Sequence, residues 1–219
     1  IHYFHFCLHI NILSYWNLFS KEHNIKYSIF FGTLLGYKRD KEFIGYDGDM
    51  DAIIDTNANK KLNDLAQDPN EKRVIFTKDL KKDLSYNNYK WKPNEIKILV
   101  KYKDYYVKCD GNKVNTYTDS CSLGMPKWGG DKLCGRVILN DINNYKYHLD
   151  LFYDYKKEKY GKFYDKVFSN LKETELEKCS VKVPNTNIIE DSLKEAYGAN
   201  WNVPIKICDK KNGKWIDNP

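Results

Sequence analysis

The sequence predicts a single α+β domain in which helices flank a mixed β-sheet. Its 219 residues are enough for one hydrophobic core but too few for two large domains. Helical spacing of apolar residues occurs near both ends, and runs of β-branched and aromatic residues fill the middle. Hydrophobic residues make up 42% and charged residues 30%, a balance that excludes a disordered chain. We therefore expect residues 1–219 to form one domain.

The first elements follow one another closely along the chain. Residues 5–22 predict an amphipathic helix, because apolar side chains recur there every three or four positions. These side chains are Leu8, Ile12, Tyr15, Trp16 and Phe19. Residues 26–31 are typical of a strand, which Gly32-Thr33 interrupts, and we expect a short helix over Leu34–Arg39.

The middle of the chain favours strands. After a turn at Lys41–Asp47, the apolar segment Met50–Ile54 predicts a buried strand, and residues 58–66 predict a helix. Further strands are expected near 73–77, 96–100, 104–109, 113–118, 136–140, 147–153 and 181–183. The glycine-rich stretch Ser120–Asp131 predicts a loop.

The last part of the chain predicts helices. Residues 156–178 are charged and expected to be helical in part, and a final helix is expected over residues 188–197. Asn187 and Glu190 have the spacing of an N-terminal capping pair, and Gly198 is expected to end the helix. Its apolar face would consist of Ile189, Leu193 and Tyr197.

The charge pattern argues against nucleic-acid binding. The chain has 36 basic and 30 acidic residues, which gives a net charge of +6. Only Arg39, Arg73 and Arg136 are arginines, and the lysines are spread among acids rather than clustered. The sequence contains no run of eighteen uncharged apolar residues, so it predicts no membrane-spanning helix within these residues. The chain begins at Ile1 rather than Met, so we expect an upstream segment, with room for a signal or membrane anchor.

The six cysteines leave two interpretations open. They are Cys7, Cys109, Cys121, Cys134, Cys179 and Cys208. No C-x-x-C pair is present, which argues against a zinc ribbon or a thioredoxin-type site. An even count permits disulfides in an oxidising compartment, and buried free thiols are the alternative.

Three acids at alternate positions predict a metal site. On an extended strand, Asp47, Asp49 and Asp51 would point to the same face about 6.6–6.8 Å apart. Carboxylates gathered in this way repel one another unless a cation lies between them, and hard divalent ions such as Mg²⁺ prefer carboxylate oxygens. A solvated acidic loop is the alternative interpretation.

Two further elements support the same chemistry. Gly32-Thr33 lies between a predicted strand and a predicted helix, where small residues allow backbone N–H groups to approach an anion. Asp150 lies in an apolar strand, where a carboxylate is costly unless it is paired or bound to metal. His148 lies on the same strand face and is a candidate for supporting that site.

These motifs together resemble those of the LicD family, the fukutin-like phosphotransferases of the nucleotidyltransferase superfamily. The resemblance is carried by Gly32-Thr33-Leu34-Leu35-Gly36, Arg39, the run Tyr46–Asp51, the strand Leu149–Phe152, and Tyr197-Gly198 with Trp201 and Pro204. It implies a nucleotidyltransferase-like mixed β-sheet flanked by helices. The order and spacing of the motifs are more specific than any one of them.

The resemblance implies a metal-dependent transferase. Such an enzyme would move a phospho-alcohol, for example phosphocholine or ribitol phosphate, from a CDP-linked donor to a hydroxyl of a glycan or glycoconjugate and release CMP. Mg²⁺ or Mn²⁺ would be the cofactor. A phosphotransferase acting on glycans would lie in the Golgi or secretory lumen in a eukaryote and in the cytoplasm in a bacterium.

The resemblance also assigns roles to individual residues. The catalytic residues are Asp47, Asp49, Asp51 and Asp150, of which Asp49, Asp51 and Asp150 would bind the metal. Asp150 or Asp47 would accept the proton of the acceptor hydroxyl. The residues expected to hold the donor phosphates are Gly32, Thr33, Lys38 and Arg39. The candidates for the acceptor side or for supporting the site are Arg136, His148, Tyr197 and Trp201.

Two other functions stay open from the sequence. A nucleotidyltransferase that hands on the nucleotide itself would use the same acids. A glycan-binding or regulatory member of the family would retain the fold without catalysis. Tyr197 and Trp201 also suit a packing role, since aromatic residues at helix ends often close the core.

Overall fold

The computed structural model describes residues 2–44, 47, 49–70, 74–76, 99–102, 105–108, 114–118, 133–139, 148–152, 161–177, 179–209 and 214–218. The helices are α1 (His2–Glu22), α2 (Phe31–Leu35), the π-helical turn η1 (Gly36–Asp40), α3 (Thr56–Gln67), α4 (Gly161–Ser169) and α5 (Thr186–Tyr197). The strands are β1 (Tyr27–Ile29), β2 (Asp49–Ile54), β3 (Val74–Phe76), β4 (Leu99–Tyr102), β5 (Tyr105–Lys108), β6 (Val114–Thr118), β7 (Leu133–Leu139), β8 (His148–Phe152), β9 (Lys172–Leu176), β10 (Cys179–Val183), β11 (Lys206–Asp209) and β12 (Lys214–Asp217).

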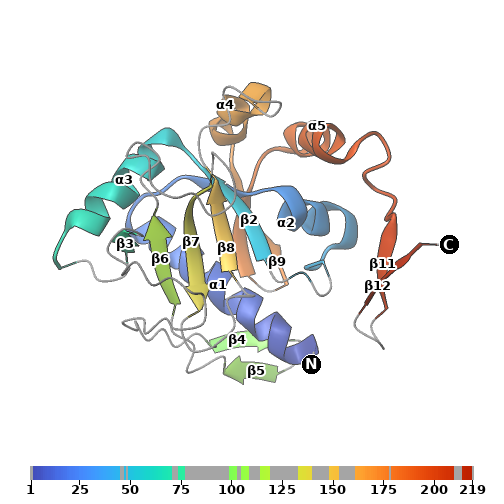
Figure 1. Cartoon of the computed structure of the whole chain (residues 1–219), viewed down its shortest axis with the longest axis horizontal. Coiled ribbons are helices and arrows are strands. Elements are labelled where there is room, and N and C mark those ends of the chain that lie inside the picture. Colours follow the sequence, from blue (N-terminus) through green and yellow to red (C-terminus); the bar gives the residue numbers. More distant parts are fainter. Residues whose placement is uncertain are drawn as a thin grey trace, which may run out of the picture.

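The described elements form an α+β structure around a six-stranded sheet in the order β1-β2-β8-β7-β6-β3. The pairs β2–β8 and β3–β6 are parallel, and the other neighbours are antiparallel, so the sheet is mixed as predicted. The neighbouring strands β2 and β8, second and third in this order, are far apart in the sequence (Figure 1). Three further two-stranded sheets pair β9 with β10, β11 with β12 and β4 with β5.

Helix α1 forms the centre of the hydrophobic core. It packs against β6, β7 and β8 of the large sheet and also against β10 (Figure 1). Between residues 9 and 20, only Leu18 is exposed, and Trp16 is completely buried. This stretch of α1 therefore buries nearly its whole circumference, because it lies between the large sheet and β10. Burying one large apolar side chain contributes about 1.5–3 kcal/mol, so this helix carries much of the core energy.

Most predicted elements are confirmed, with shifted ends. The strand predicted at 26–31 is shorter, because Phe31 opens α2 with a positive φ of 41°. The final helix begins earlier than predicted, and Asn185 rather than Asn187 caps it by accepting a hydrogen bond from the Ile188 N–H. The predicted capping pair is therefore wrong.

Near the C-terminus the structure adds two elements that the sequence did not predict and corrects one residue. The segment 156–178 is helical in part, as expected, in α4, but its residues 172–176 form strand β9. Tyr197 was placed on the buried face of the last helix but is 44% exposed, whereas Ile189 and Leu193 are buried. The hairpin β11–β12 is not predicted by the sequence patterns. The predicted loop Ser120–Asp131 lies outside the described residues.

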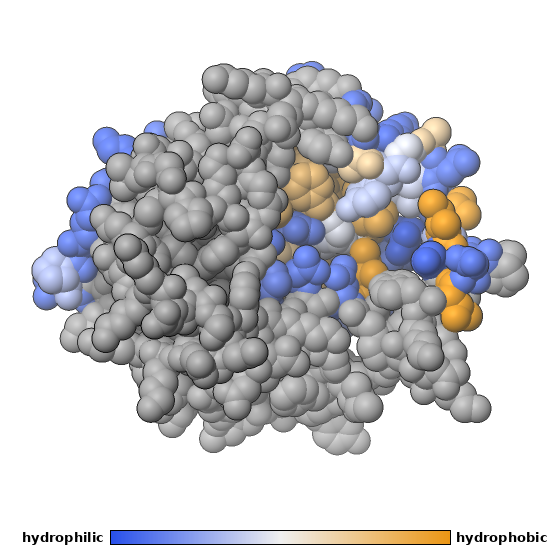
Figure 2. Space-filling model, viewed as in Figure 1, coloured by the Kyte–Doolittle hydropathy of each residue, from blue (hydrophilic) through white to orange (hydrophobic). Residues whose placement is uncertain are grey.

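One edge of the described surface carries exposed apolar side chains. Figure 2 shows them where β11 and β12 lie, and the exposed large apolar residues at this edge are Val203, Ile205 and Ile216.

Cys179 is a buried free thiol, with its Sγ 3.4 Å from the Ser14 Oγ. The other cysteine side chains lie outside the described part of the chain. No described helix is both long and apolar enough to cross a bilayer.

Candidate functional site

Strands β2 and β8 bring two pairs of polar residues to one face of the sheet. Their parallel register pairs Asp49 with His148 and Asp51 with Asp150. Successive side chains of a strand point to opposite faces, so these four side chains share one face. The intervening residues Met50, Leu149 and Leu151 are buried on the other face. A slip of one residue would exchange the two sets, so burial of the apolar residues fixes the position of the acids.

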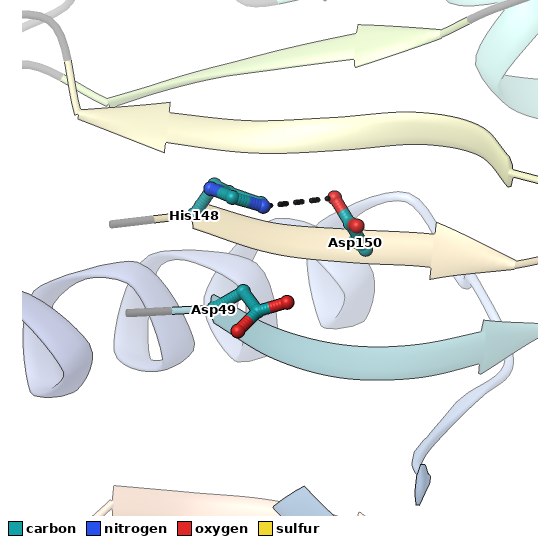
Figure 3. Close-up of side chains that lie close together, drawn as sticks. All are labelled: Asp49, His148 and Asp150. Carbon is teal, nitrogen blue, oxygen red and sulfur yellow. Dashed lines mark ion pairs between the residues drawn. The ribbon is translucent and has the colours of Figure 1, made fainter. Parts of the chain in front are cut away.

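Asp49, His148 and Asp150 form a candidate metal centre. Each offers one ligand atom, and the three atoms all lie within 4.8 Å of one another. Figure 3 shows the imidazole of His148 directed towards Asp150, with Asp49 on the neighbouring strand. The His148 Nε2 lies 3.4 Å from the Asp150 Oδ1, and the Asp150 residue is only 6% exposed. Carboxylate oxygens and an imidazole nitrogen fit a divalent cation.

The predicted ligand set is only partly brought together. Asp49 and Asp150 converge as expected, but the third member of the compact group is His148, whereas the sequence predicted Asp51. The catalytic roles of these residues stay predictions.

Asp51 is hydrogen-bonded to the first turn of α2. Its Oδ2 accepts a hydrogen bond from the Gly32 N–H at 3.2 Å, and its own backbone N–H donates to the Thr33 Oγ1 at 2.8 Å. Burial, with the nearby charges of Asp49 and Asp150, raises the pKa of Asp51 to about 8, although the Gly32 hydrogen bond lowers it. Without a cation, this carboxyl group therefore holds a proton at neutral pH.

Gly32 lies against the carboxyl groups of Asp51 and Asp47. A Cβ atom at Gly32 would be 3.4 Å from the Asp51 Oδ2 and 3.6 Å from the Asp47 Oδ2. Gly32 and Thr33 lie inside α2 and not in a turn before the helix, as the sequence had predicted, and the Gly32 N–H that was expected to bind a phosphate already donates to Asp51. The Thr33 hydroxyl likewise accepts from the backbone of Asp51. In this state the first turn of α2 holds the acidic strand in place.

A small cleft lies beside the acidic group. Its lining residues are His9, Gly32, Thr33, Phe43, Ile44, Asp47, Asp49 and Met50. The sequence did not predict a role for His9, which is 4% exposed and has its ring centroid 4.9 Å from that of Phe43. Nothing in the local pattern distinguishes this histidine from other helix residues. Only the packing of α1 brings it to the cleft.

The two basic residues predicted to bind phosphate are paired with acids. Lys38 lies 3.0 Å from the Glu190 carboxylate of α5. Arg39 donates two hydrogen bonds of 2.7 Å to the carboxylate of its neighbour Asp40. Both residues lie in the π-helical turn η1, a type of turn that is frequent at functional sites.

The other residues predicted for the acceptor side are Arg136, Tyr197 and Trp201. The Cα of Arg136 on β7 is paired in register with that of Asp150, while its side chain lies outside the described residues. Trp201 is half-buried and packs against the core, and Tyr197 is largely exposed at the end of α5. Neither aromatic residue lines the cleft.

Comparison with known proteins adds one finding. Residues 24–123 match the family model described as LicD/FKTN/FKRP, nucleotidyltransferase domain. The matched segment includes β1, the Gly32-Thr33 turn and the acids of β2, and it ends before β8. No curated protein matches the chain.

Proposed function

The chain belongs to the LicD family, with residues 24–123 as the matching segment, and on this premise we propose that it is a phosphotransferase acting on glycans. It would move a phospho-alcohol such as phosphocholine, ribitol phosphate or glycerol phosphate from a CDP-linked donor to a glycan hydroxyl. The proposal is supported above all by the register of β2 and β8, which gathers Asp49, Asp51, His148 and Asp150 on one sheet face.

The mixed sheet supports a nucleotidyltransferase-like arrangement. Strand β1 leads through α2, which contains Gly32 and Thr33, and through η1 to β2, which carries two acids, and β8 next to it carries a third. Asp49, His148 and Asp150 are the residues that would hold a divalent cation. When bound, such a cation would neutralise part of the negative charge of the donor diphosphate.

The proposed reaction is a single displacement at phosphorus. The oxygen of the acceptor hydroxyl forms a bond to the phosphorus atom that carries the alcohol, and the bond from that phosphorus to the bridging oxygen of CMP breaks. CMP leaves with the bridging oxygen and its electron pair. We assign Asp47, which lines the cleft beside Gly32, as the base that accepts the hydroxyl proton.

Lys38 and Arg39 would bind the donor phosphates by exchanging partners. Their present ion pairs with Glu190 and Asp40 join partly exposed side chains. Ion pairs between partly exposed side chains contribute little to stability, so their replacement by a diphosphate costs little. Gly32 and Thr33 would contribute the backbone N–H and the hydroxyl once their hydrogen bonds with Asp51 are released.

Product analysis tests the proposal. The protein is incubated with Mg²⁺ or Mn²⁺, a glycan acceptor and CDP-choline, CDP-ribitol or CDP-glycerol, and CMP release is measured. We expect acceptor-dependent CMP release from one donor, its loss in Asp49→Asn, and its retention in Asp64→Asn, which removes an exposed acid of α3. Release of pyrophosphate from CTP would instead indicate nucleotidyl transfer. Saturable donor binding without turnover would indicate a binding or regulatory protein.

A further inference from the structure

We propose that the hairpin β11–β12 docks on an anionic lipid surface. The apolar contact is made by the exposed side chains of Val203, Ile205 and Ile216, which together form the C-terminal patch. No residue of this patch lines the acidic cleft. The proposal therefore goes beyond the phosphotransferase activity and does not rest on it.

The C-terminal patch exposes side chains that proteins usually bury. Ile205 is 82% exposed, Val203 56% and Ile216 45%. Among the described residues five large apolar side chains are exposed, and three of the five belong to this patch. A single exposed apolar residue is ordinary on a protein surface, whereas a group of them indicates an interaction surface.

Hydrogen bonds hold the patch at the base of the hairpin. The Asn218 backbone N–H donates to the Ile205 carbonyl oxygen, and the Asn218 side-chain amide donates to the Pro204 carbonyl oxygen, both at 2.9 Å. Strands β11 and β12 form a two-stranded sheet of their own, which lies at the edge of the molecule in Figure 1. A two-stranded hairpin is only marginally stable in water by itself, so a surface that covers its apolar side chains would stabilise it.

The charge of the same segment complements an anionic surface. Residues 203–218 contain four lysines and two aspartates, with no arginine or glutamate, which gives a net charge of +2. Lys206 directly follows Ile205 and is exposed, and Figure 2 shows hydrophilic residues beside the apolar ones at this edge. A lysine keeps its carbon chain along apolar surface while its ammonium group reaches outward. Each lysine near an anionic leaflet strengthens binding about fivefold. The lysines are Lys206, Lys210, Lys211 and Lys214.

These features suit a lipid surface better than a protein partner. A specific protein interface buries about 800 Å² on each side, which is more than three aliphatic side chains can supply. Its core is also depleted of lysine and enriched in arginine and aromatic residues. Shallow insertion of a few apolar side chains, combined with attraction between lysines and anionic lipids, is how peripheral proteins bind a bilayer.

Co-sedimentation of the whole chain with vesicles tests the proposal. The bound fraction is measured for phosphatidylcholine vesicles with and without phosphatidylserine, at increasing salt and without any donor or acceptor. We expect binding that requires phosphatidylserine and falls as salt rises, because added ions screen the attraction between lysines and lipids. Ile205→Ser should weaken this binding on the order of tenfold, and Lys206→Gln about fivefold.

Leu18→Ser is the matched control, because Leu18 is 57% exposed but lies on α1 rather than on the hairpin. It should bind vesicles like the wild type. Ile205 precedes β11 and is mostly exposed, so circular dichroism and urea unfolding should show that Ile205→Ser keeps the fold.

Three results with vesicles would overturn the proposal: no binding by the wild type, equal binding without phosphatidylserine, or an equal loss in Leu18→Ser. Light scattering adds a fourth. A dimer that Ile205→Ser converts to a monomer would show that a second copy of the chain covers the patch instead of lipid. None of these measurements depends on CMP release, so the proposed function can fail separately.

Discussion

Replacing Asp51 by asparagine should make the metal-free protein more stable, and increasingly so as the pH rises. The asparagine side chain keeps the shape of the residue and an oxygen that can accept from the Gly32 N–H, but it removes the charge. In the folded wild type, burial and the charges of Asp49 and Asp150 raise the pKa of Asp51 to about 8. In the unfolded chain the pKa of an aspartate is about 3.9.

The sign of the effect follows from proton binding. Between about pH 4 and pH 8 the folded protein holds a proton on Asp51 that the unfolded chain has lost, so the free energy of unfolding falls as the pH rises. One proton corresponds to about 1.4 kcal/mol per pH unit. Between pH 5 and pH 7 the wild type should therefore lose on the order of 2–3 kcal/mol relative to Asp51→Asn.

Urea unfolding in the presence of a chelator measures this difference. The free energy of unfolding is determined at pH 5, 6 and 7 for the wild type, for Asp51→Asn and for the exposed control Asp64→Asn. The gap between wild type and Asp51→Asn should widen with pH, while Asp64→Asn should run parallel to the wild type. Parallel curves for Asp51→Asn as well would refute the reasoning that Asp51 is protonated in the folded state.

Three other predictions test the surroundings of the site. Gly36→Ala should destabilise the fold by about 1–3 kcal/mol, because a Cβ there would lie 2.6 Å from the Glu42 carbonyl oxygen; an unchanged urea midpoint would contradict this packing. Asn185→Ala should cost about 1 kcal/mol of stability and Asn187→Ala much less, and equal losses in the two variants would argue against the observed cap. Burial raises the pKa of the Cys179 thiol to about 12, so iodoacetamide at pH 8 should modify it only after unfolding; mass spectrometry of native and urea-treated protein would reveal early labelling, which would show the thiol to be accessible.

Local patterns predicted the elements whose burial follows a simple period. The helix over residues 5–22 and the strands at Met50–Ile54 and 147–153 were recognised because their apolar residues repeat every three to four positions or form short buried runs. Strand β9 was missed, because Lys172–Leu176 contains three charged residues and becomes a strand only by pairing with β10. A pairing partner outside the local window leaves no signal in the segment itself.

The cap of the last helix was misplaced for a related reason. Asn185 and Asn187 both suit an N-cap, and the choice of Asn187 rested on its spacing from Glu190. Strand β10 ends at Val183, and the helix begins at Thr186 with the Asn185 side chain accepting from the Ile188 N–H. Both asparagines suit the cap by residue type, so the local pattern did not distinguish them.

The amino-acid sequence alone determined that the acids of β2 occur at alternate positions and that an acid and a histidine do so in a second apolar strand. Alternation is a local property of extended chain, so it needed no knowledge of the fold. Only the tertiary structure decided how the two strands meet. Parallel pairing in one register placed His148 beside Asp49, and the first turn of α2 bound the Asp51 carboxyl group. Register and turn contacts depend on how distant segments bury their apolar faces together, and no short stretch of sequence contains that information.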